Sequence, residues 1–284
     1  MNTLQEILSP DFLLRNSVYV SVLVGLISPI LGIFLVLRRL IFLGIALPQV
    51  SSTGIAFALA LHILAGHDSP IHDASEQTMA FVGSLSFTLV AVIVLAVMER
   101  RGRGLVEGRL GTLYVVATAL SVLMLAKCPQ AERGWLNLLK GELVALSLRD
   151  LVTTSIAFVI VCSVLFLFGR ILLLVSYDRE MAITLGKRPL VWDLVLYLLL
   201  GTTISVSVLS VGPMIAFGFL IIPPLTAHRI ASSMKQLFLL SSLIGGLSAI
   251  VGFWIAYHFD LPVGPTDISF LAAIYLVTVI FTRR

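Results

Sequence analysis

Apolar residues occupy most of this chain in long runs that are separated by short polar stretches. A helix needs about 20 mostly apolar residues to cross the hydrocarbon core of a bilayer. Runs that approach or exceed this length lie near residues 17–37, 41–64, 79–98, 110–126, 151–175, 190–210, 212–227, 236–257 and 268–282. The pattern therefore predicts an all-α bundle of about eight or nine transmembrane helices.

The segments between these runs are too short to hold a hydrophobic core of their own. We expect residues 1–16 to form an interfacial or extracytoplasmic lead-in and residues 17–284 to form a single transmembrane domain. Because the N-terminus lacks a basic region followed by a cleavage site, we expect no removed signal peptide.

Composition agrees with a polytopic membrane protein. Hydrophobic residues make up 58% of the 284 residues and charged residues 12%, which is about half of the ~25% that soluble domains carry. The net charge of +4 is spread among the apolar runs, which argues against a nucleic-acid partner. Cys128 and Cys162 form neither a Cys-x-x-Cys metal motif nor a disulfide framework.

The distribution of arginine and lysine predicts how the chain is oriented. Loops on the cytoplasmic side of a membrane protein carry an excess of these residues. With the N-terminus outside, fourteen of the nineteen basic residues fall on the cytoplasmic side and five on the opposite side. We therefore expect an extracytoplasmic N-terminus and a cytoplasmic C-terminus.

Two spans contain residues that disturb a transmembrane helix. In residues 44–54, Pro48 suits the first turn of a helix, and Gln49, Ser52 and Thr53 then share one face. In residues 211–224, Gly212-Pro213 is followed by Pro223-Pro224. The sixteen residues 212–227 would reach only about 24 Å as a helix, short of a ~30 Å core, and we expect the proline pair to break it further.

Lipid cannot satisfy free backbone groups, so breaks of this kind face protein or a water-filled cavity. Paired interrupted spans favour a substrate pathway; the alternative is a pair of kinks that only shape packing. Thr203, Ser207 and Ser210 share a face and either line a pore or bond back to carbonyls four residues earlier. The predicted pathway residues are Gln49, Ser52, Thr53, Ser207, Gly212, Pro213 and Pro223.

The run near 236–257 contains Ser241, Gly245 and Ala249 at four-residue spacing. Small residues at this spacing let two helices approach closely. We expect the partner helix to belong to the same chain rather than to a second copy.

Residues 177–189 have the pattern of a short, complete helix. Asp178 can cap its N-terminus, Glu180 suits the positive end of the helix dipole, and Gly186 can end it. Met181, Ala182 and Leu185 would then form a small apolar patch. Such a helix suits docking to a separate motor subunit; the alternative is a linker that rests on lipid headgroups.

The sequence lacks the motifs of an ATP-hydrolysing enzyme. No Gly-x-x-x-x-Gly-Lys-Ser/Thr phosphate loop occurs, since Gly186-Lys187 is followed by Arg188. Neither a Ser/His/Asp nor a Cys/His constellation is recognisable. We therefore expect a transport subunit that is not itself an enzyme, with any ATP chemistry supplied by another chain.

Five landmarks resemble those of a known family and occur in its order: Leu37-Arg38-Arg39; Gly44 with Gly54; the helix from Asp178 to Gly186 with Asp193 beyond it; Val211-Gly212 leading to Ile221-Ile222-Pro223; and Leu261-Pro262-x-Gly264-Pro265-Thr266. Together they resemble the ABC-3 type permease subunit of zinc, manganese and iron ABC importers, over about residues 17–282. The resemblance implies a type II ABC importer permease fold in a bacterial plasma membrane.

The resemblance also implies a mechanism and partners. The chain would pass a divalent transition metal into the cytoplasm by alternating access, without binding a cofactor of its own. Its partners would be a second permease copy, two cytoplasmic ABC ATPases and an extracytoplasmic substrate-binding protein, in a lipid bilayer. The ATPase-coupling residues would be Asp178, Glu180, Met181, Ala182, Leu185 and Gly186, with residues 228–236 as a second cytoplasmic contact.

One departure from the family concerns the metal itself. The relatives usually carry Asp where this chain has Ile45 and His where it has Gln49. A neutral amide is a much poorer ligand for Zn²⁺ than a carboxylate or an imidazole. Either the pathway holds metal weakly and leaves selection to the receptor, or other ligands substitute, or the cargo is not a naked ion.

Substitute metal ligands are few. The candidates are His62, His67, Asp68, His72 and Asp73, at the outer end of the second run and in the loop that follows it. An intramembrane His is a functional candidate, but His62 is near enough to the end to reach headgroups, and loop acids are usually solvated. His228 is expected to meet lipid phosphate or the ATPase.

Three alternatives to a metal-ion permease remain. The same ABC architecture could import a chelated metal or a small organic solute, which follows from Ile45 and Gln49. An ATP-independent channel or secondary transporter is disfavoured because such carriers usually keep intramembrane carboxylates, and Asp193 is expected to be the only one within a span. A non-transporting scaffold is disfavoured by the disturbed spans.

Overall fold

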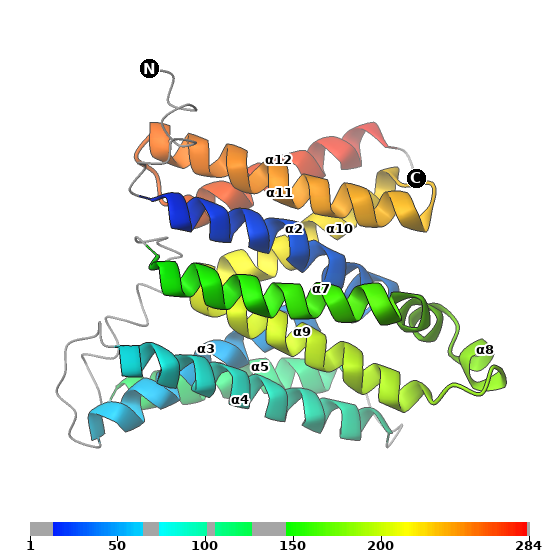
Figure 1. The fold of residues 1–284 in the computed structure, drawn as a ribbon, viewed down its shortest axis with the longest axis horizontal. Coiled ribbons are helices and arrows are strands. Elements are labelled where there is room, and N and C mark those ends of the chain that lie inside the picture. The colour runs from blue at the N-terminus through cyan, green and yellow to red at the C-terminus, as the bar shows by residue number, and fades with distance from the viewer. Residues whose placement is uncertain (1–13, 65–73, 101–105, 127–145, 283–284) are drawn as a thin grey trace.

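The computed structural model describes residues 14–64, 74–100, 106–126 and 146–282, and within these ranges the chain is helical without strands (Figure 1). In this described part of the chain, nine long helices run back and forth along one axis, and a short helix, α8, lies at one end of the bundle. The helices are α2 (Arg15–Leu37), α3 (Leu43–Leu64), α4 (Ala74–Arg100), α5 (Val106–Leu125), α7 (Leu148–Tyr177), α8 (Arg179–Thr184), α9 (Pro189–Val211), α10 (Pro213–Ile230), α11 (Met234–His258) and α12 (Val263–Phe281).

Eight of the long helices are apolar and long enough to cross a membrane. The ninth, α5, has 20 residues and carries Glu107 and Arg109 in its first turn. The expectation of an all-α bundle with about eight or nine spans is therefore confirmed, and each helix begins and ends within a few residues of the predicted run.

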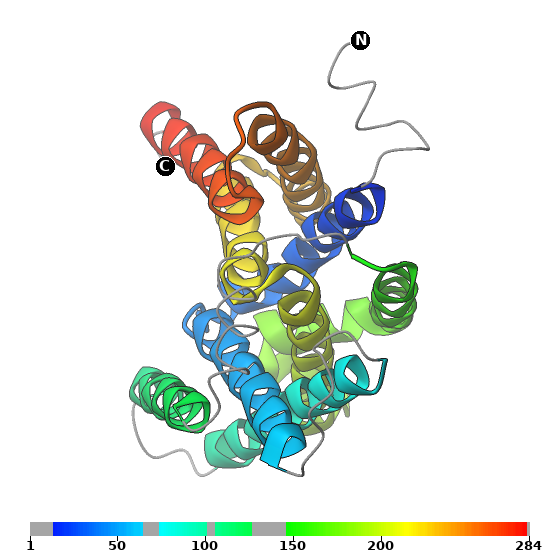
Figure 2. The same ribbon diagram turned by 90° about the vertical axis from the view of Figure 1, so that its left-hand side faces the viewer.

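The helices form two groups that are joined by α7 and α9. One group contains α2, α10, α11 and α12, and the other contains α3, α4 and α5 (Figures 1 and 2). Helix α9 packs against α4, α7 and α10, and α5 packs mainly on α3. The side chains of Phe34, Leu47, Leu200 and Leu220 belong to one buried cluster that connects the two groups.

Glycines let α2 pack very closely on its neighbours. A Cβ atom built on Gly245 of α11 would overlap the carbonyl oxygen of Gly25, and one built on Gly25 would lie 2.7 Å from the carbonyl oxygen of Gly245. Ser241 and Ala249, one turn to either side of Gly245, are also buried. The expected small-residue contact is therefore confirmed, and its partner is α2 of the same chain.

The prolines do not break the spans as expected. Helix α3 begins at Leu43, so that Pro48 lies in its second turn, and α10 continues through Pro223 and Pro224 to Ile230. With 18 residues, α10 is longer than predicted. Pro223 and Pro224 leave the carbonyls of Phe219 and Leu220 without their usual N–H partners, and a membrane protein tolerates such groups where neighbouring helices or side chains compensate.

The interruption in this region lies at Gly212 instead. Gly212 separates α9 from α10 with φ 86° and ψ 161°, a conformation that is readily available only to glycine. Pro213 follows at the first helical position, where the missing N–H costs nothing.

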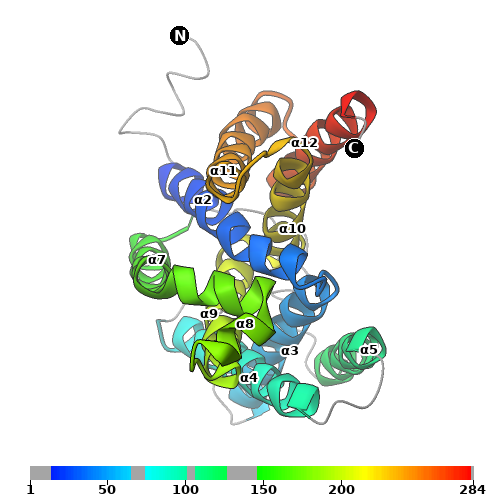
Figure 3. The same cartoon turned by 90° about the vertical axis from the view of Figure 1, so that its right-hand side faces the viewer.

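The two ends of the bundle differ in charge. The end that carries α8 is at the right of Figure 1 and faces the viewer in Figure 3. Among the described residues, ten arginines and lysines belong to the helix ends and turns on that side, whereas only Arg15 and Arg149 belong to the opposite end. This asymmetry predicts that the α8 end is cytoplasmic.

Candidate functional site: the docking helix and the pathway helices

Helix α8 is defined by hydrogen bonds at both ends. The Met181 N–H donates to Asp178 Oδ1 at 2.9 Å, so Asp178 is the N-cap. At the other end, the N–H of Gly186 donates to the Ile183 carbonyl and the N–H of Lys187 to the Ala182 carbonyl. This is the Schellman pattern, and Gly186 adopts the φ of 71° that it requires.

The exposed face of α8 differs from the predicted patch. Met181, Ile183 and Leu185 are 51%, 56% and 57% exposed, whereas Ala182 is completely buried. Ala182 therefore packs toward the bundle, while Ile183 is exposed. Met181 and Leu185 lie one turn apart on one side of the helix and Ile183 lies on another side, and we call these three exposed side chains together the α8 apolar face (Met181, Ile183 and Leu185). Three exposed apolar side chains on so short a helix are typical of a docking surface.

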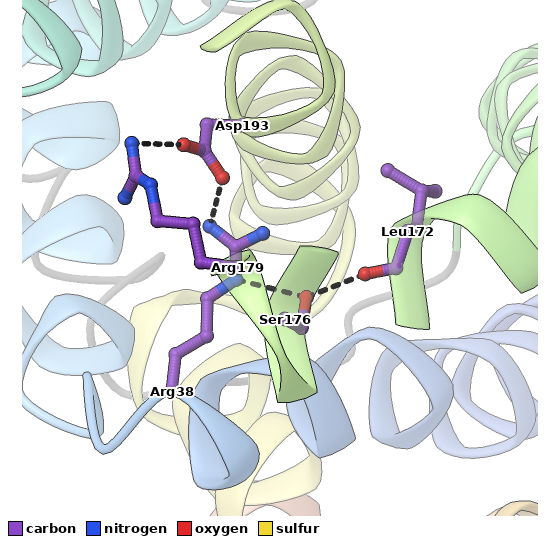
Figure 4. Close-up of polar contacts among 5 residues, drawn as sticks. All are labelled: Arg38, Leu172, Ser176, Arg179 and Asp193. Atoms are coloured by element: carbon purple, nitrogen blue, oxygen red, sulfur yellow. Dashed lines mark hydrogen bonds and ion pairs between the residues drawn. The ribbon is translucent and has the colours of Figure 1, made fainter. Parts of the chain in front are cut away.

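An ion-pair network attaches α8 to the bundle (Figure 4). The Asp193 carboxylate of α9 accepts a hydrogen bond from Arg38 Nη1 at 2.6 Å and pairs with Arg179 Nη2 of α8 at 3.1 Å. Arg38 Nε also donates to the Ser176 hydroxyl of α7 at 2.9 Å. One carboxylate therefore connects the ends of α2, α7, α8 and α9.

The two arginines of this network are held very differently. The Arg38 side chain is 9% exposed, and its guanidinium lies 6.0 Å from the centre of the Tyr197 ring. The Arg179 side chain is 52% exposed. The Arg38–Asp193 pair is thus a buried, rigid junction, whereas Arg179 joins it from the solvent side.

Ile45 and Gln49 lie on one face of α3. A helix turns about 100° per residue, so residues four apart are separated by about 40°. Both are partly exposed, while a Cβ on Gly44 would lie 3.0 Å from Ile221 of α10. The Thr53 hydroxyl lies 2.9 Å from the Ala117 carbonyl of α5. We infer that the Ile45–Gln49 face points between α5 and α10, the helices that lie on either side of α3 in Figure 3.

Several predicted pathway residues join helices in this structure. The Thr53 hydroxyl lies 2.8 Å from the Gln49 carbonyl of its own helix and also within hydrogen-bond distance of the Ala117 carbonyl of α5. The Ser207 hydroxyl lies 3.4 Å from Ser28 of α2, and the Ser210 hydroxyl lies 2.9 Å from Thr154 of α7. Ser207 and Ser210 therefore contact hydroxyls of other helices rather than carbonyls four residues earlier in their own helix. Their part in a pathway stays a prediction.

The remaining predicted pathway residues are either buried within helices or lie at the junction of two helices. Ser52 and Pro223 are buried, and Gly212-Pro213 forms the turn between α9 and α10. The start of α3 meets α10 directly, since Gly44 packs on Ile221. The two segments expected to line the pathway therefore lie side by side, although they come from different halves of the chain.

Most of the predicted substitute metal ligands lie outside the part of the chain that the structure describes. His62 lies in the last turn of α3, and His67, Asp68, His72 and Asp73 lie outside the described ranges. Within those ranges, no three His, Cys, Asp or Glu side chains form a group that could hold a metal ion. Metal binding by these five residues stays a prediction.

The expectation that Asp193 is the only carboxylate within a span is wrong. Helix α12 begins at Val263, five residues earlier than predicted, which places Asp267 in its second turn. Asp267 is completely buried and packs against Gly252 of α11. The Ser21 hydroxyl of α2 is close, yet within the described part of the chain neither oxygen of this carboxylate makes a hydrogen bond of acceptable geometry.

Known proteins resemble this chain over nearly its whole length. It is 27% identical over 266 residues to the manganese import system permease protein ScaB of Streptococcus parasanguinis, covering 93% of this chain and 89% of that protein. It is 27% identical over 284 residues to the zinc transport system membrane protein TroC of Treponema pallidum, covering 98% and 92%.

The fold also matches that of a solved structure. A chain of PsaBC from Streptococcus pneumoniae, solved in complex with Fab, superimposes with a TM-score of 0.82 and 22% identity, covering 99% of this chain and 95% of that one. The ABC 3 transport family model matches residues 11–282. The chain therefore belongs to the ABC 3 transport family, as a multi-pass protein of the bacterial plasma membrane.

Proposed function

We propose that this chain is the permease subunit of an ABC importer that passes a divalent transition metal ion into the cytoplasm. The observation that carries this proposal is the capped helix α8, which exposes three apolar side chains and is tied by Asp193 to the junction of α2, α7 and α9. A motor that binds α8 would act directly on these helices. The relatives named for manganese and zinc support a metal as the cargo.

The motor and the other components would be separate chains. This sequence carries no phosphate loop, so cytoplasmic ABC ATPases would bind the α8 apolar face and supply the energy. A second permease copy and an extracytoplasmic substrate-binding protein would complete the transporter. Alternating access would then follow from the ATPases shifting α8 relative to α3 and α10.

The Ile45–Gln49 face suggests how the ion would pass. Residues 45–53 contain no His, Cys, Asp or Glu, so they offer the cargo only neutral oxygen donors such as the Gln49 amide. Such donors hold a divalent ion weakly, and they lack the nitrogen and sulfur atoms that favour Zn²⁺. We infer that this face lets a partly hydrated ion such as Mn²⁺ pass and leaves selection to the receptor.

Metal uptake by the reconstituted transporter tests the cargo. Vesicles that contain permease, ATPase and receptor should take up Mn²⁺ when ATP is supplied. The double variant Ile45→Asp with Gln49→His should retain the metal longer and release it more slowly, because it adds a carboxylate and an imidazole. Ile45→Asn with Gln49→Asn is the matched control, since it adds polarity without a strong ligand.

Ile45 and Gln49 also favour a second candidate, an ABC importer of a chelated metal or a small organic solute. An aliphatic side chain and an amide suit an uncharged or shielded cargo better than a bare ion. If neither the native nor the double-variant transporter moves Mn²⁺, Zn²⁺ or Fe²⁺ while a chelate crosses, this second function replaces the first.

Co-purification tests whether a motor is needed at all. Ile183→Asp with Leu185→Asp should abolish capture of the ATPase, because two charges replace half-exposed apolar contacts. Thr184→Asp adds a charge to the same helix without removing apolar surface, and it should leave capture nearly intact. A permease that never binds an ATPase, yet conducts ions, would instead be a channel.

A further inference from the structure

A pocket of about 660 Å³ lies where the ends of α10, α11 and α12 meet, on the same end of the bundle as α8. Its lining includes His228, Arg229, Ser232, Ser233 and Tyr275. None of these residues belongs to the Asp193 network or to the Ile45–Gln49 face. The pocket is therefore separate from α8 and from the Ile45–Gln49 face, although it overlaps residues 228–236, for which the resemblance implies a second cytoplasmic contact.

The polar part of the lining is rich in hydrogen-bond donors, and Arg229 gives it a positive charge. The guanidinium of Arg229 lies 5.8 Å from the centre of the Tyr275 ring, which orients it beside the aromatic face. Neither residues 223–237 nor residues 268–284 contain an Asp or Glu. The pocket therefore has a positive potential without a built-in counter-charge.

The start of α11 adds to this potential. The Ser233 hydroxyl accepts the Gln236 N–H at 3.3 Å, and the Gln236 side-chain oxygen accepts the Ser232 N–H at 3.0 Å. These two bonds fix the first turn of a 25-residue helix. The N–H groups of Met234 and Lys235 belong to the same turn, and the helix itself offers them no acceptor. They and the positive end of the helix dipole favour an anion.

Apolar side chains border the basic lining. Ile230 and Met234 are 46% and 38% exposed, and Leu276, next to Tyr275, is 58% exposed. Tyr275 lies six residues before the end of α12, which corresponds to about 9 Å. A tyrosine at this depth is typical of the boundary between headgroups and acyl chains.

We propose that this pocket binds the headgroup of an anionic phospholipid from the cytoplasmic leaflet. The lipid phosphate would pair with Arg229 and accept hydrogen bonds from the Ser232 and Ser233 hydroxyls and the first N–H groups of α11. The acyl chains would run along the exposed apolar side of α12. A basic lining next to apolar surface matches an amphiphile better than a soluble anion or a protein.

Native mass spectrometry of the purified permease tests this proposal. The protein is delipidated and titrated with phosphatidylglycerol or, in parallel, with phosphatidylcholine. The native chain should retain phosphatidylglycerol preferentially, and Arg229→Gln should weaken this binding by about tenfold, because a charge-assisted hydrogen bond is lost. Arg229→Lys should keep most of the affinity.

Arg170→Gln is the matched control. Arg170 is an exposed arginine in the half of α7 that lies toward α8, and it lines no part of the pocket. Equal losses in the two Gln variants would overturn the proposal, as would equal retention of the two lipids. Thermal unfolding in lipid-free detergent supplies another arm: if inorganic phosphate protects as well as phosphatidylglycerol, the pocket binds a free anion. Displacement of the bound lipid by added ATPase would show that a protein covers the pocket.

Discussion

A buried carboxylate at a membrane surface is stable only when cations and hydrogen-bond donors surround it. Asp193 meets this condition, because each of its oxygens faces an arginine. The two arginines contribute unequally: the Arg38 side chain is 9% exposed and the Arg179 side chain 52%. Screening by water weakens the outer pair, so the stability of this junction depends on Arg38.

Asp193→Asn is therefore expected to destabilise the permease by about 3–5 kcal/mol, since it leaves Arg38 as a buried charge without a counter-ion. Arg179→Gln should cost less than about 1 kcal/mol. Thermal or denaturant unfolding of the purified permease in detergent measures both changes. Similar losses in the two variants would mean that Arg179 is held as firmly as Arg38.

Asp267 represents the opposite situation. It is completely buried and neither of its oxygens has a hydrogen-bond partner, and an unsatisfied buried polar group costs about 1–3 kcal/mol. Asp267→Asn should raise the unfolding free energy by about 1 kcal/mol, because the amide can donate to the nearby Ser21 hydroxyl. The same exchange at Asp193 should lower it. If Asp267→Asn also destabilises the chain, the native carboxyl group already bonds a neighbour such as the Ser21 hydroxyl.

At the scale of elements, close backbone approach holds α2 against α11. Gly245→Ala would place a methyl group on the carbonyl oxygen of Gly25, and forcing the helices apart should cost about 1–3 kcal/mol. Gly169→Ala in α7 is the control, because no atom lies within 4 Å of the position where its Cβ would be. That variant should gain up to about 1 kcal/mol from helix propensity. Equal effects on the unfolding midpoint would argue against tight packing at Gly245.

The positions of the helices could be predicted because the thickness of the bilayer sets the length of an apolar run. What could not be predicted was how the chain tolerates proline inside these runs. Pro48 and Pro223-Pro224 remain within continuous helices, and in membrane proteins such helices are tolerated where the surrounding protein compensates for the freed backbone groups. Gly212 was identified as part of the interruption because it precedes a proline. Its role in the turn depends on its positive φ.

The sequence could predict only those features of the site that depend on residues close together in the chain. The cap at Asp178 and the stop at Gly186 depend on residues within one helical turn, so the sequence pattern was sufficient. The contact between Arg38 and Asp193 spans 155 positions and requires the packing of α2 on α9. Asp267 was missed because an apolar run marks the hydrophobic part of a span, whereas α12 begins earlier, at a Val-Gly-Pro turn.

At the scale of the whole molecule, the Asp193 network connects the docking helix to the pathway helix. Arg38 caps the end of α2, and only five residues separate α2 from α3, which carries Ile45 and Gln49. If an ATPase displaces α8, we expect Arg179 to carry the displacement to Asp193, and Arg38 to carry it from there to the turn that leads into α3. Because the inner pair is rigid and the outer one exposed, Arg179 is the connection that an ATPase could load or release.

Arg179→Gln is accordingly expected to separate ATP hydrolysis from transport. The α8 apolar face is unchanged in this variant, so the ATPase should still bind and hydrolyse ATP, but metal uptake per ATP should fall several-fold because α8 no longer pulls on Asp193. Arg188→Gln removes an exposed charge from the same segment and should leave the ratio unchanged. Uptake and hydrolysis are measured together in vesicles. If uptake and hydrolysis fall in parallel, Arg179 serves docking of the ATPase. If neither uptake nor hydrolysis falls, the motion reaches α3 by another route, through the packing of α7 on α9.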